Sequence, residues 1–126
     1  MQIPPELKFS KDHEWAERAA DHIRIGITDY AQDALGDVVF VDLPTVGTSF
    51  SAGATIGEVE STKSVSEIYA PVAGTVIEVN AALSSSPELV NEDPYGAGWI
   101  CVIQLDDEGT YDVLLDAAAY GDLTNQ

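Results

Sequence analysis

Cysteine and basic side chains are scarce in this chain of 126 residues, and each scarcity excludes a class of protein. Cys101 is the only cysteine, so the chain cannot form an internal disulfide and differs from the small secreted scaffolds that disulfides hold together. The initial segment MQIPPE has the pattern of neither a signal peptide nor a transit peptide. No apolar run approaches the length that crosses a membrane. We therefore expect a cytoplasmic protein in a reducing compartment.

Lysine and arginine together number 5, against 22 aspartates and glutamates, which gives a formal net charge of −17 at pH 7. The acidic residues are spread from Glu6 to Asp122 and are not gathered in one tail. Such a surface repels phosphate backbones and anionic lipid headgroups. We therefore expect no binding to nucleic acid or membranes, and charged partners that present basic patches.

Motifs for catalysis and for metal or nucleotide binding are also missing. The only histidines, His13 and His22, fall on two different predicted strands, and neither HxxxH nor CxxC occurs. There is no GxGxxG and no Walker-type lysine, and LDDEGTYD lacks the alternating ligand positions of a calcium loop. Cys101 lies in the apolar run WICVIQL and is typical of a buried strand thiol. We expect no catalytic residue and no metal site.

Short segments with alternating apolar residues predict a chain built mainly of β-strands. Ile23, Ile25 and Ile27 alternate with His22, Arg24 and Gly26, as in a half-buried strand of a hairpin. Strands are predicted in two parts of 15–28 and in 38–44, 55–61, 64–71, 74–80 and 99–105. We expect a short helix from residue 28 or 29 to Gly36, a polar loop over 84–98, and a second helix within 111–123 that ends near Gly121. These elements favour one all-β domain over residues 1–126, a sandwich or flattened barrel with peripheral helices.

One of the three lysines, Lys63, occupies a distinctive place in the segment ESTKSVSEIYAP. If residues 55–61 and 64–71 pair as a hairpin, Thr62 and Lys63 lie at its exposed turn. Lys63 is then either an ordinary surface lysine or an amine that carries an acyl group. A flexible lysine stem would let such a group swing between the active sites of partner enzymes. A carrier of this kind needs no catalytic residues of its own.

The segment ESTKSVSEIYAPVAG (60–74) resembles the lipoyl-attachment segment of glycine cleavage system H proteins, with Lys63 at the modified position. The resemblance extends to HEW (13–15), GITDYAQDALGDVVFVDLP (26–44), EVN (78–80) and PELVNEDPYGAGW (87–99). These blocks follow the order and spacing of the family from about residue 9 to residue 120.

The resemblance implies a mainly β, lipoyl-domain-like barrel-sandwich of two small antiparallel sheets with short peripheral helices. It also implies lipoic acid joined covalently to Lys63 and a non-catalytic carrier role. The carrier shuttles the aminomethyl group of glycine from glycine decarboxylase (P-protein) to the aminomethyltransferase (T-protein), and then visits dihydrolipoyl dehydrogenase (L-protein). A lipoylating enzyme is the fourth implied partner. A monomer is the default expectation.

Two glutamates are candidates for contacts with the loaded arm. An aminomethyl group on sulfur is cationic and prone to hydrolysis, so a carrier gains by folding it against a carboxylate and away from water. Glu14, in the HEW block, is the main hypothesis, and Glu67 is the second; either side chain is otherwise a solvated strand carboxylate. Ala34 stands where some members of the family carry a histidine, so we expect no polar contact with the arm from that position.

Four alternatives remain open at this point. Biotin carriers have Met-Lys-Met at the modified lysine, and lipoyl domains of 2-oxo acid dehydrogenases have Asp-Lys-Ala, whereas this chain has Thr62-Lys63-Ser64. A family member that relays lipoate to other proteins would have the same sequence pattern. An unmodified interaction module would keep Lys63 as a bare surface residue.

Overall fold

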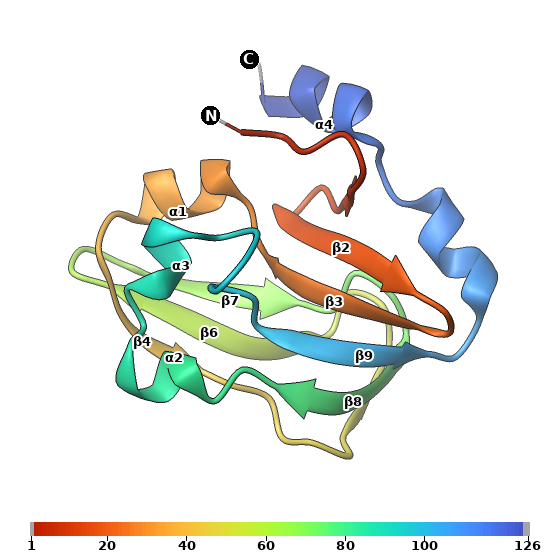
Figure 1. Cartoon of the computed structure of the whole chain (residues 1–126), viewed down its shortest axis with the longest axis horizontal. Coiled ribbons are helices and arrows are strands. Elements are labelled where there is room, and N and C mark those ends of the chain that lie inside the picture. The colour runs from red at the N-terminus through yellow and green to blue at the C-terminus, as the bar shows by residue number, and fades with distance from the viewer. Residues whose placement is uncertain (1, 125–126) are drawn as a thin grey trace.

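The chain folds into two antiparallel sheets, and this computed structural model describes residues 2–124, apart from the side chain of residue 108. The ends of the predicted unit 1–126 therefore lie outside the described residues. The first sheet has six strands, in the order β1 (Lys8–Phe9), β2 (Glu14–Ala19), β3 (His22–Ile27), β9 (Cys101–Leu105), β8 (Gly74–Val79) and β5 (Ser49–Phe50). The second has three, in the order β4 (Val38–Asp42), β6 (Thr55–Ser61) and β7 (Val65–Tyr69). In Figure 1, β6 and β7 lie behind β3 and β9. The predicted fold of two antiparallel sheets is confirmed.

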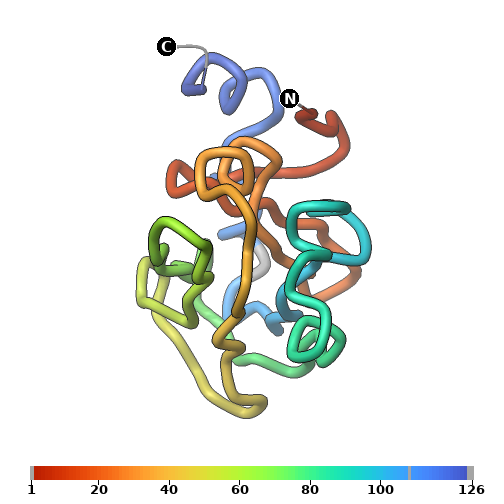
Figure 2. Tube along the Cα trace, turned by 90° about the vertical axis from the view of Figure 1, so that its left-hand side faces the viewer, coloured from red at the N-terminus to blue at the C-terminus, as the bar shows by residue number. Residues whose placement is uncertain are grey.

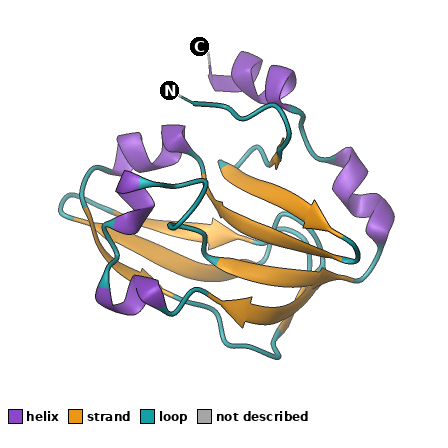
Figure 3. Ribbon diagram, viewed as in Figure 1, coloured by secondary structure: helices purple, strands orange, loops and turns teal. Residues whose placement is uncertain are grey.

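Short helices lie at the periphery of the sheets, as Figure 3 shows. They are α1 (Asp29–Leu35), α2 (Ala82–Ser85), α3 (Leu89–Glu92), the 3₁₀ segment η1 (Glu108–Val113) and α4 (Ala117–Thr124). The prediction of α1 is confirmed, because Thr28 accepts a hydrogen bond from the Ala31 N–H and Gly36 ends the helix with φ +81°. No helix within residues 2–124 is long and apolar enough to cross a membrane.

Two predictions about helices were wrong. Part of the expected loop over 84–98 forms α2 and α3, single turns that bury Leu83 and Val90 and are too short to leave a periodic pattern. Gly121 does not end the last helix, which continues to Thr124. Burial of Tyr120 holds that helix against the body of the protein and outweighs the weak helix propensity of glycine.

Apolar side chains divide into two buried clusters. The larger lies between the sheets and contains the alternating Ile23, Ile25 and Ile27 of β3, as the sequence predicts. On β7 the inward residue is Ile68, whereas Val65 and Glu67 face solvent. The smaller cluster joins β1 and β2 to α4 and consists of Leu7, Phe9, Trp15 and Tyr120. The C-terminal helix is therefore tied to the N-terminal strands.

Candidate functional site

Lys63 lies at the tip of the β6–β7 hairpin, which confirms the predicted pairing. Ser61 organises the turn: its hydroxyl accepts hydrogen bonds from the backbone N–H groups of Lys63 (3.3 Å) and Ser64 (3.1 Å). The Ser61 N–H donates to the Ser64 carbonyl at 2.8 Å. Lys63 is exposed, and the hairpin projects from the end of the molecule that faces the viewer in Figure 2.

The hairpin rests on the turn between α1 and β4. The Thr62 N–H donates to the Asp37 carbonyl at 3.1 Å. The Lys63 stem passes over Gly36, where an added Cβ would lie 3.4 Å from Lys63 Cε. Glycine at this position therefore has two roles: it adopts the positive φ that ends α1, and it leaves room for the lysine stem.

Asn91 of α3 holds that same turn from the other side. Its Oδ1 accepts from the Val38 N–H at 2.8 Å, and its Nδ2 donates to Gln32 Oε1 at 3.0 Å and to the Gly36 carbonyl at 2.8 Å. Asn91 was not among the predicted site residues. Its only sequence signal is its place in the block 87–99, which lies far from Lys63 along the chain.

A groove of about 310 Å³ runs between the hairpin and α1, and we call it the hairpin groove. Three segments contribute to it: the turn before β2, helix α1 and the start of β7. Its lining residues are Asp12, His13, Tyr30, Ala31, Ala34, Leu35, Ser64, Val65 and Ser66. The groove thus combines a wall of small and aliphatic side chains with polar groups at its edges.

His13 lies in the turn before β2, so its predicted place on a strand was wrong. Its φ of +71° is in the left-handed region, which a strand residue does not adopt. The cause is Ser10, whose hydroxyl accepts hydrogen bonds from the N–H groups of Asp12 and Glu14, both at 3.2 Å, and bends the chain. The bend turns His13 toward α1.

Glu14, the main candidate for an arm contact, is buried, with an exposed fraction of 1%. It is not the solvated strand carboxylate of the alternative interpretation. Its carboxylate accepts from the Ser10 hydroxyl at 2.5 Å and from the Tyr69 N–H at 3.4 Å. Burial raises the pKa of Glu14 to about 8, although these two hydrogen bonds oppose the shift. Glu14 is therefore mainly protonated at neutral pH.

Glu67, the second candidate, is exposed on β7. Its Oε2 accepts a hydrogen bond from the Tyr69 hydroxyl at 2.8 Å. Tyr69 thus contacts both glutamates, Glu14 through its backbone N–H and Glu67 through its side chain. Neither glutamate is among the described residues that line the hairpin groove.

Cys101 is buried in β9, as predicted from its apolar run. Burial raises the pKa of its thiol to about 12. A thiol that is neutral and inaccessible is not a nucleophile.

Comparisons with known proteins match almost the whole chain. The family described as Glycine cleavage H-protein matches residues 7–126. The glycine cleavage system H protein of Mycobacterium avium is 58% identical over 128 residues, which cover 97% of each chain. That of Mycobacterium tuberculosis is 57% identical over 130 residues, again 97% of each chain. A crystal structure of a glycine cleavage system H protein from Mycobacterium marinum aligns with TM-score 0.90 and 43% identity, covering 98% of this chain and 100% of that one.

These matches confirm the predicted family and the lipoyl-domain-like fold. They set aside the biotin carrier, the 2-oxo acid dehydrogenase domain and the unmodified interaction module. The chain belongs to the glycine cleavage H-protein family and is a non-catalytic carrier, which holds lipoate on a lysine and shuttles the aminomethyl group of glycine among the decarboxylase, the aminomethyltransferase and dihydrolipoyl dehydrogenase.

Proposed function

We propose that Lys63 is the lysine that carries lipoate, and that residues 1–126 act as one carrier domain. The observation that supports this assignment is the place of Lys63 at an exposed hairpin tip with its stem over Gly36. The other two lysines differ: Lys8 is on β1, and Lys11 lies in the turn that follows it. The β1–β2 turn that holds Lys11 also contributes Asp12 and His13 to the hairpin groove, so the feature that separates Lys63 from Lys11 is the Lys63 stem over Gly36.

The surroundings of Lys63 fit an acylated lysine. Ala31 and Leu35 of α1 and Val65 of β7 provide apolar contacts for an aliphatic chain along the hairpin groove. Ala34 leaves space there that a larger side chain would fill. Bound lipoate supplies a dithiolane, which accepts the aminomethyl group of glycine, yields it to a folate-dependent enzyme and is then reoxidised.

We propose further that Glu14 receives the cationic aminomethyl cargo, with Glu67 as a weaker outer contact. A cation close to a buried carboxyl stabilises the ionised form, so Glu14 would release its proton as the cargo enters. The pair of hydrogen bonds from Ser10 and Tyr69 would then hold the carboxylate in place. Glu67 is exposed to water, so its attraction for the cargo would be screened.

The assignment of Lys63 is tested by mass spectrometry after incubation with a lipoylating enzyme and lipoate. We expect the wild-type mass to rise by one lipoyl amide, and peptide mapping to place it within residues 60–71. Lys63→Arg should stay unmodified, whereas Lys8→Arg and Lys11→Arg should be modified like the wild type. Lipoate on Lys8 or Lys11, or a modified Lys63→Arg, would overturn the assignment. A glycine decarboxylation assay then measures the carrier activity of the modified protein.

A cytoplasmic location is also proposed. It is supported by the bacterial relatives and by the single, buried thiol. A monomeric state stays a prediction.

A further inference from the structure

The ring of His13 is held between two tyrosines at the edge of the hairpin groove. Tyr30 of α1 stacks on it with ring centroids 4.7 Å apart and planes inclined by 29°. Tyr120 of α4 meets it edge-on, with centroids 5.7 Å apart and an angle of 71°. An α4 residue 107 positions away thus contacts a residue that lines the groove beside Lys63.

A chain of hydrogen bonds connects His13 to the start of α1. The Tyr120 hydroxyl is 2.8 Å from His13 Nδ1 and 2.7 Å from the Thr28 hydroxyl. Thr28 in turn accepts from the Ala31 N–H, and its own N–H donates to the His13 carbonyl at 3.1 Å. Tyr120 and Thr28 are fully buried, so these hydrogen bonds are shielded from water.

This arrangement commits Nδ1 of His13 to Tyr120 and leaves Nε2 for a ligand. Among the hydrogen bonds of the described residues, none involves His13 Nε2. Burial lowers the pKa of His13, and the nearby Asp12 only partly opposes the shift. A neutral imidazole does not repel a cation, and it can hydrogen-bond an amide or an amine through its second nitrogen.

We propose that His13 contacts the lipoyl-lysine arm in the hairpin groove through Nε2, and that Tyr120 is the positioning residue that holds the ring in this orientation. The proposal rests on the proposed attachment at Lys63. It assigns α4 a role in the carrier site, although α4 does not line the hairpin groove. Asp12 is the charged residue that lines the groove beside His13, while the carboxyl of Glu14 is buried behind the turn.

The positioning half of the proposal is tested on the protein without lipoate, by Tyr120→Phe. The ring stays, because it stacks on Phe9 with centroids 4.7 Å apart, and only the hydroxyl is lost. In ¹⁵N-labelled protein, the chemical shifts of the two imidazole nitrogens show which of them carries the proton. We expect one dominant tautomer in the wild type and a mixture in Tyr120→Phe.

Tyr95→Phe is the matched control. The Tyr95 hydroxyl also serves α1, because it accepts from the Asp29 N–H at 3.0 Å and donates to the Gln2 carbonyl at 2.6 Å, but it does not contact His13. We expect its His13 signals to match the wild type. Thr28→Ser should keep the wild-type tautomer, whereas Thr28→Ala should shift it. An unchanged tautomer in Tyr120→Phe, or equal shifts in both tyrosine variants, would overturn the positioning role.

The proposed contact between His13 and the arm is tested by comparing wild-type protein with and without lipoate, after mass spectrometry has located the modification. We expect the Nε2 signal to shift more than the Nδ1 signal on lipoylation. His13→Asn, which tolerates the positive φ, should shorten the lifetime of the aminomethyl cargo by roughly two- to tenfold, the factor for one hydrogen bond. Lipoate on Lys63 with no change at Nε2 would overturn the contact, whereas lipoate elsewhere would instead overturn the proposed attachment.

Discussion

At the scale of single residues, Glu14 and Glu67 show how environment separates two identical carboxyl groups. Glu14 is enclosed by Ser10 and the backbone of Tyr69, whereas Glu67 faces water on the outer side of β7. Desolvation disfavours the charged form only where water is excluded. A buried, protonated carboxyl such as that of Glu14 can exchange its proton for a cation.

Glu14→Gln is expected to change how stability depends on pH. The pKa of Glu14 is about 8 in the folded protein and about 4.5 in the unfolded chain, so the folded state binds the proton more tightly. Its contribution is fully present below the lower value and is lost as pH rises to about 8, at roughly 1.4 kcal/mol per pH unit. Denaturant unfolding of the variant should show a weaker loss of stability over this range.

The same variant tests the proposed role of Glu14 toward the cargo. Without an ionisable group at this position, the aminomethyl lifetime should shorten, while Glu67→Gln should change the lifetime less. An unchanged lifetime in Glu14→Gln would contradict the role. If the free energy of unfolding of Glu14→Gln fell with pH as steeply as that of the wild type, this would contradict the raised pKa of Glu14.

At the scale of elements, the α1–β4 turn is the support on which the lysine hairpin rests. Asn91 fixes the turn through Gln32, Gly36 and Val38, and the turn contacts the hairpin through the Thr62 N–H. The one-turn helix α3 therefore matters for the site because it delivers this single amide side chain. If the turn is displaced, Lys63 is displaced with it, and a lipoylating enzyme that recognises the hairpin would then modify Lys63 more slowly.

Asn91→Ala should slow lipoylation of Lys63 beyond any effect on folding. Asn80→Ala is the control, because Asn80 also makes three hydrogen bonds, to the carbonyls of Ala97 and Trp99 and from the Ala82 N–H, and none of these three is to the α1–β4 turn. Each variant should lose about 1–4 kcal/mol of unfolding free energy. Initial rates of lipoylation should fall only in Asn91→Ala, and equal rates in the two variants would rule out the positioning effect.

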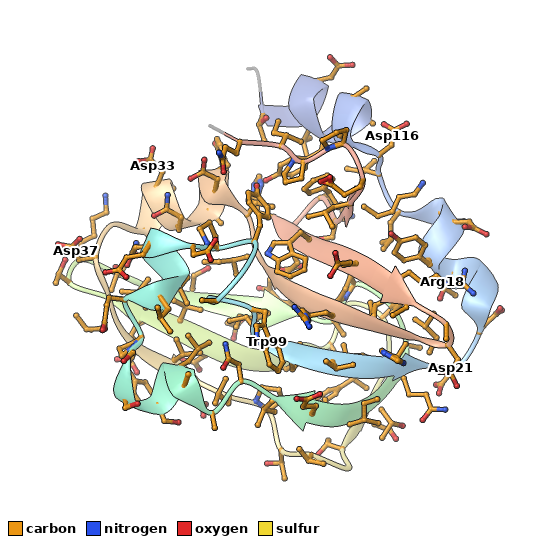
Figure 4. The ribbon with its side chains drawn as sticks, in the orientation of Figure 1. Arg18, Asp21, Asp33, Asp37, Trp99 and Asp116 are labelled. Atoms are coloured by element: carbon orange, nitrogen blue, oxygen red, sulfur yellow. The ribbon has the colours of Figure 1, made fainter. Side chains whose placement is uncertain are left out.

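At the scale of the whole molecule, the net charge of −17 governs encounters with partners. Acidic side chains from different elements point outward, as Asp21, Asp33, Asp37 and Asp116 do in Figure 4. Lys63 therefore approaches each partner on a strongly negative body. Long-range attraction to a basic patch raises association rates, and salt screens it.

Oxidation of the reduced, lipoylated protein by dihydrolipoyl dehydrogenase and its electron acceptor should therefore slow as salt is added, under conditions where association limits the rate. The screening length falls from about 30 Å at 0.01 M salt to about 8 Å at 0.15 M, and we expect the rate to fall by roughly tenfold. Free dihydrolipoamide, which is uncharged, is the control and should be oxidised at a nearly constant rate. Equal salt dependence for both substrates would show that salt acts on the enzyme and not on the encounter.

Patterns that depend on neighbouring residues were enough to predict much of this protein. The alternation of Ile23, Ile25 and Ile27 determines which face of β3 is buried, because successive side chains of a strand point in opposite directions. Thr28 and Gly36 mark the ends of α1, and the two predicted strands 55–61 and 64–71 place Thr62 and Lys63 at the exposed turn between them. The family follows from five blocks in order. By itself, then, the sequence determined the longer strands, the lysine hairpin and the carrier role, whereas the two-residue strands β1 and β5 were not predicted.

Tertiary structure alone decided how distant residues support that hairpin. Contacts between Asn91 and the α1–β4 turn, or between Tyr120 and His13, join positions that share no periodic pattern. The burial of Glu14, the helical turns at Leu83 and Val90, and the helix that continues past Gly121 also depend on packing. The physical reason is that desolvation and hydrogen-bond partners are set by whichever segments meet in space, whereas a local pattern specifies only the direction of a side chain from its own strand or helix.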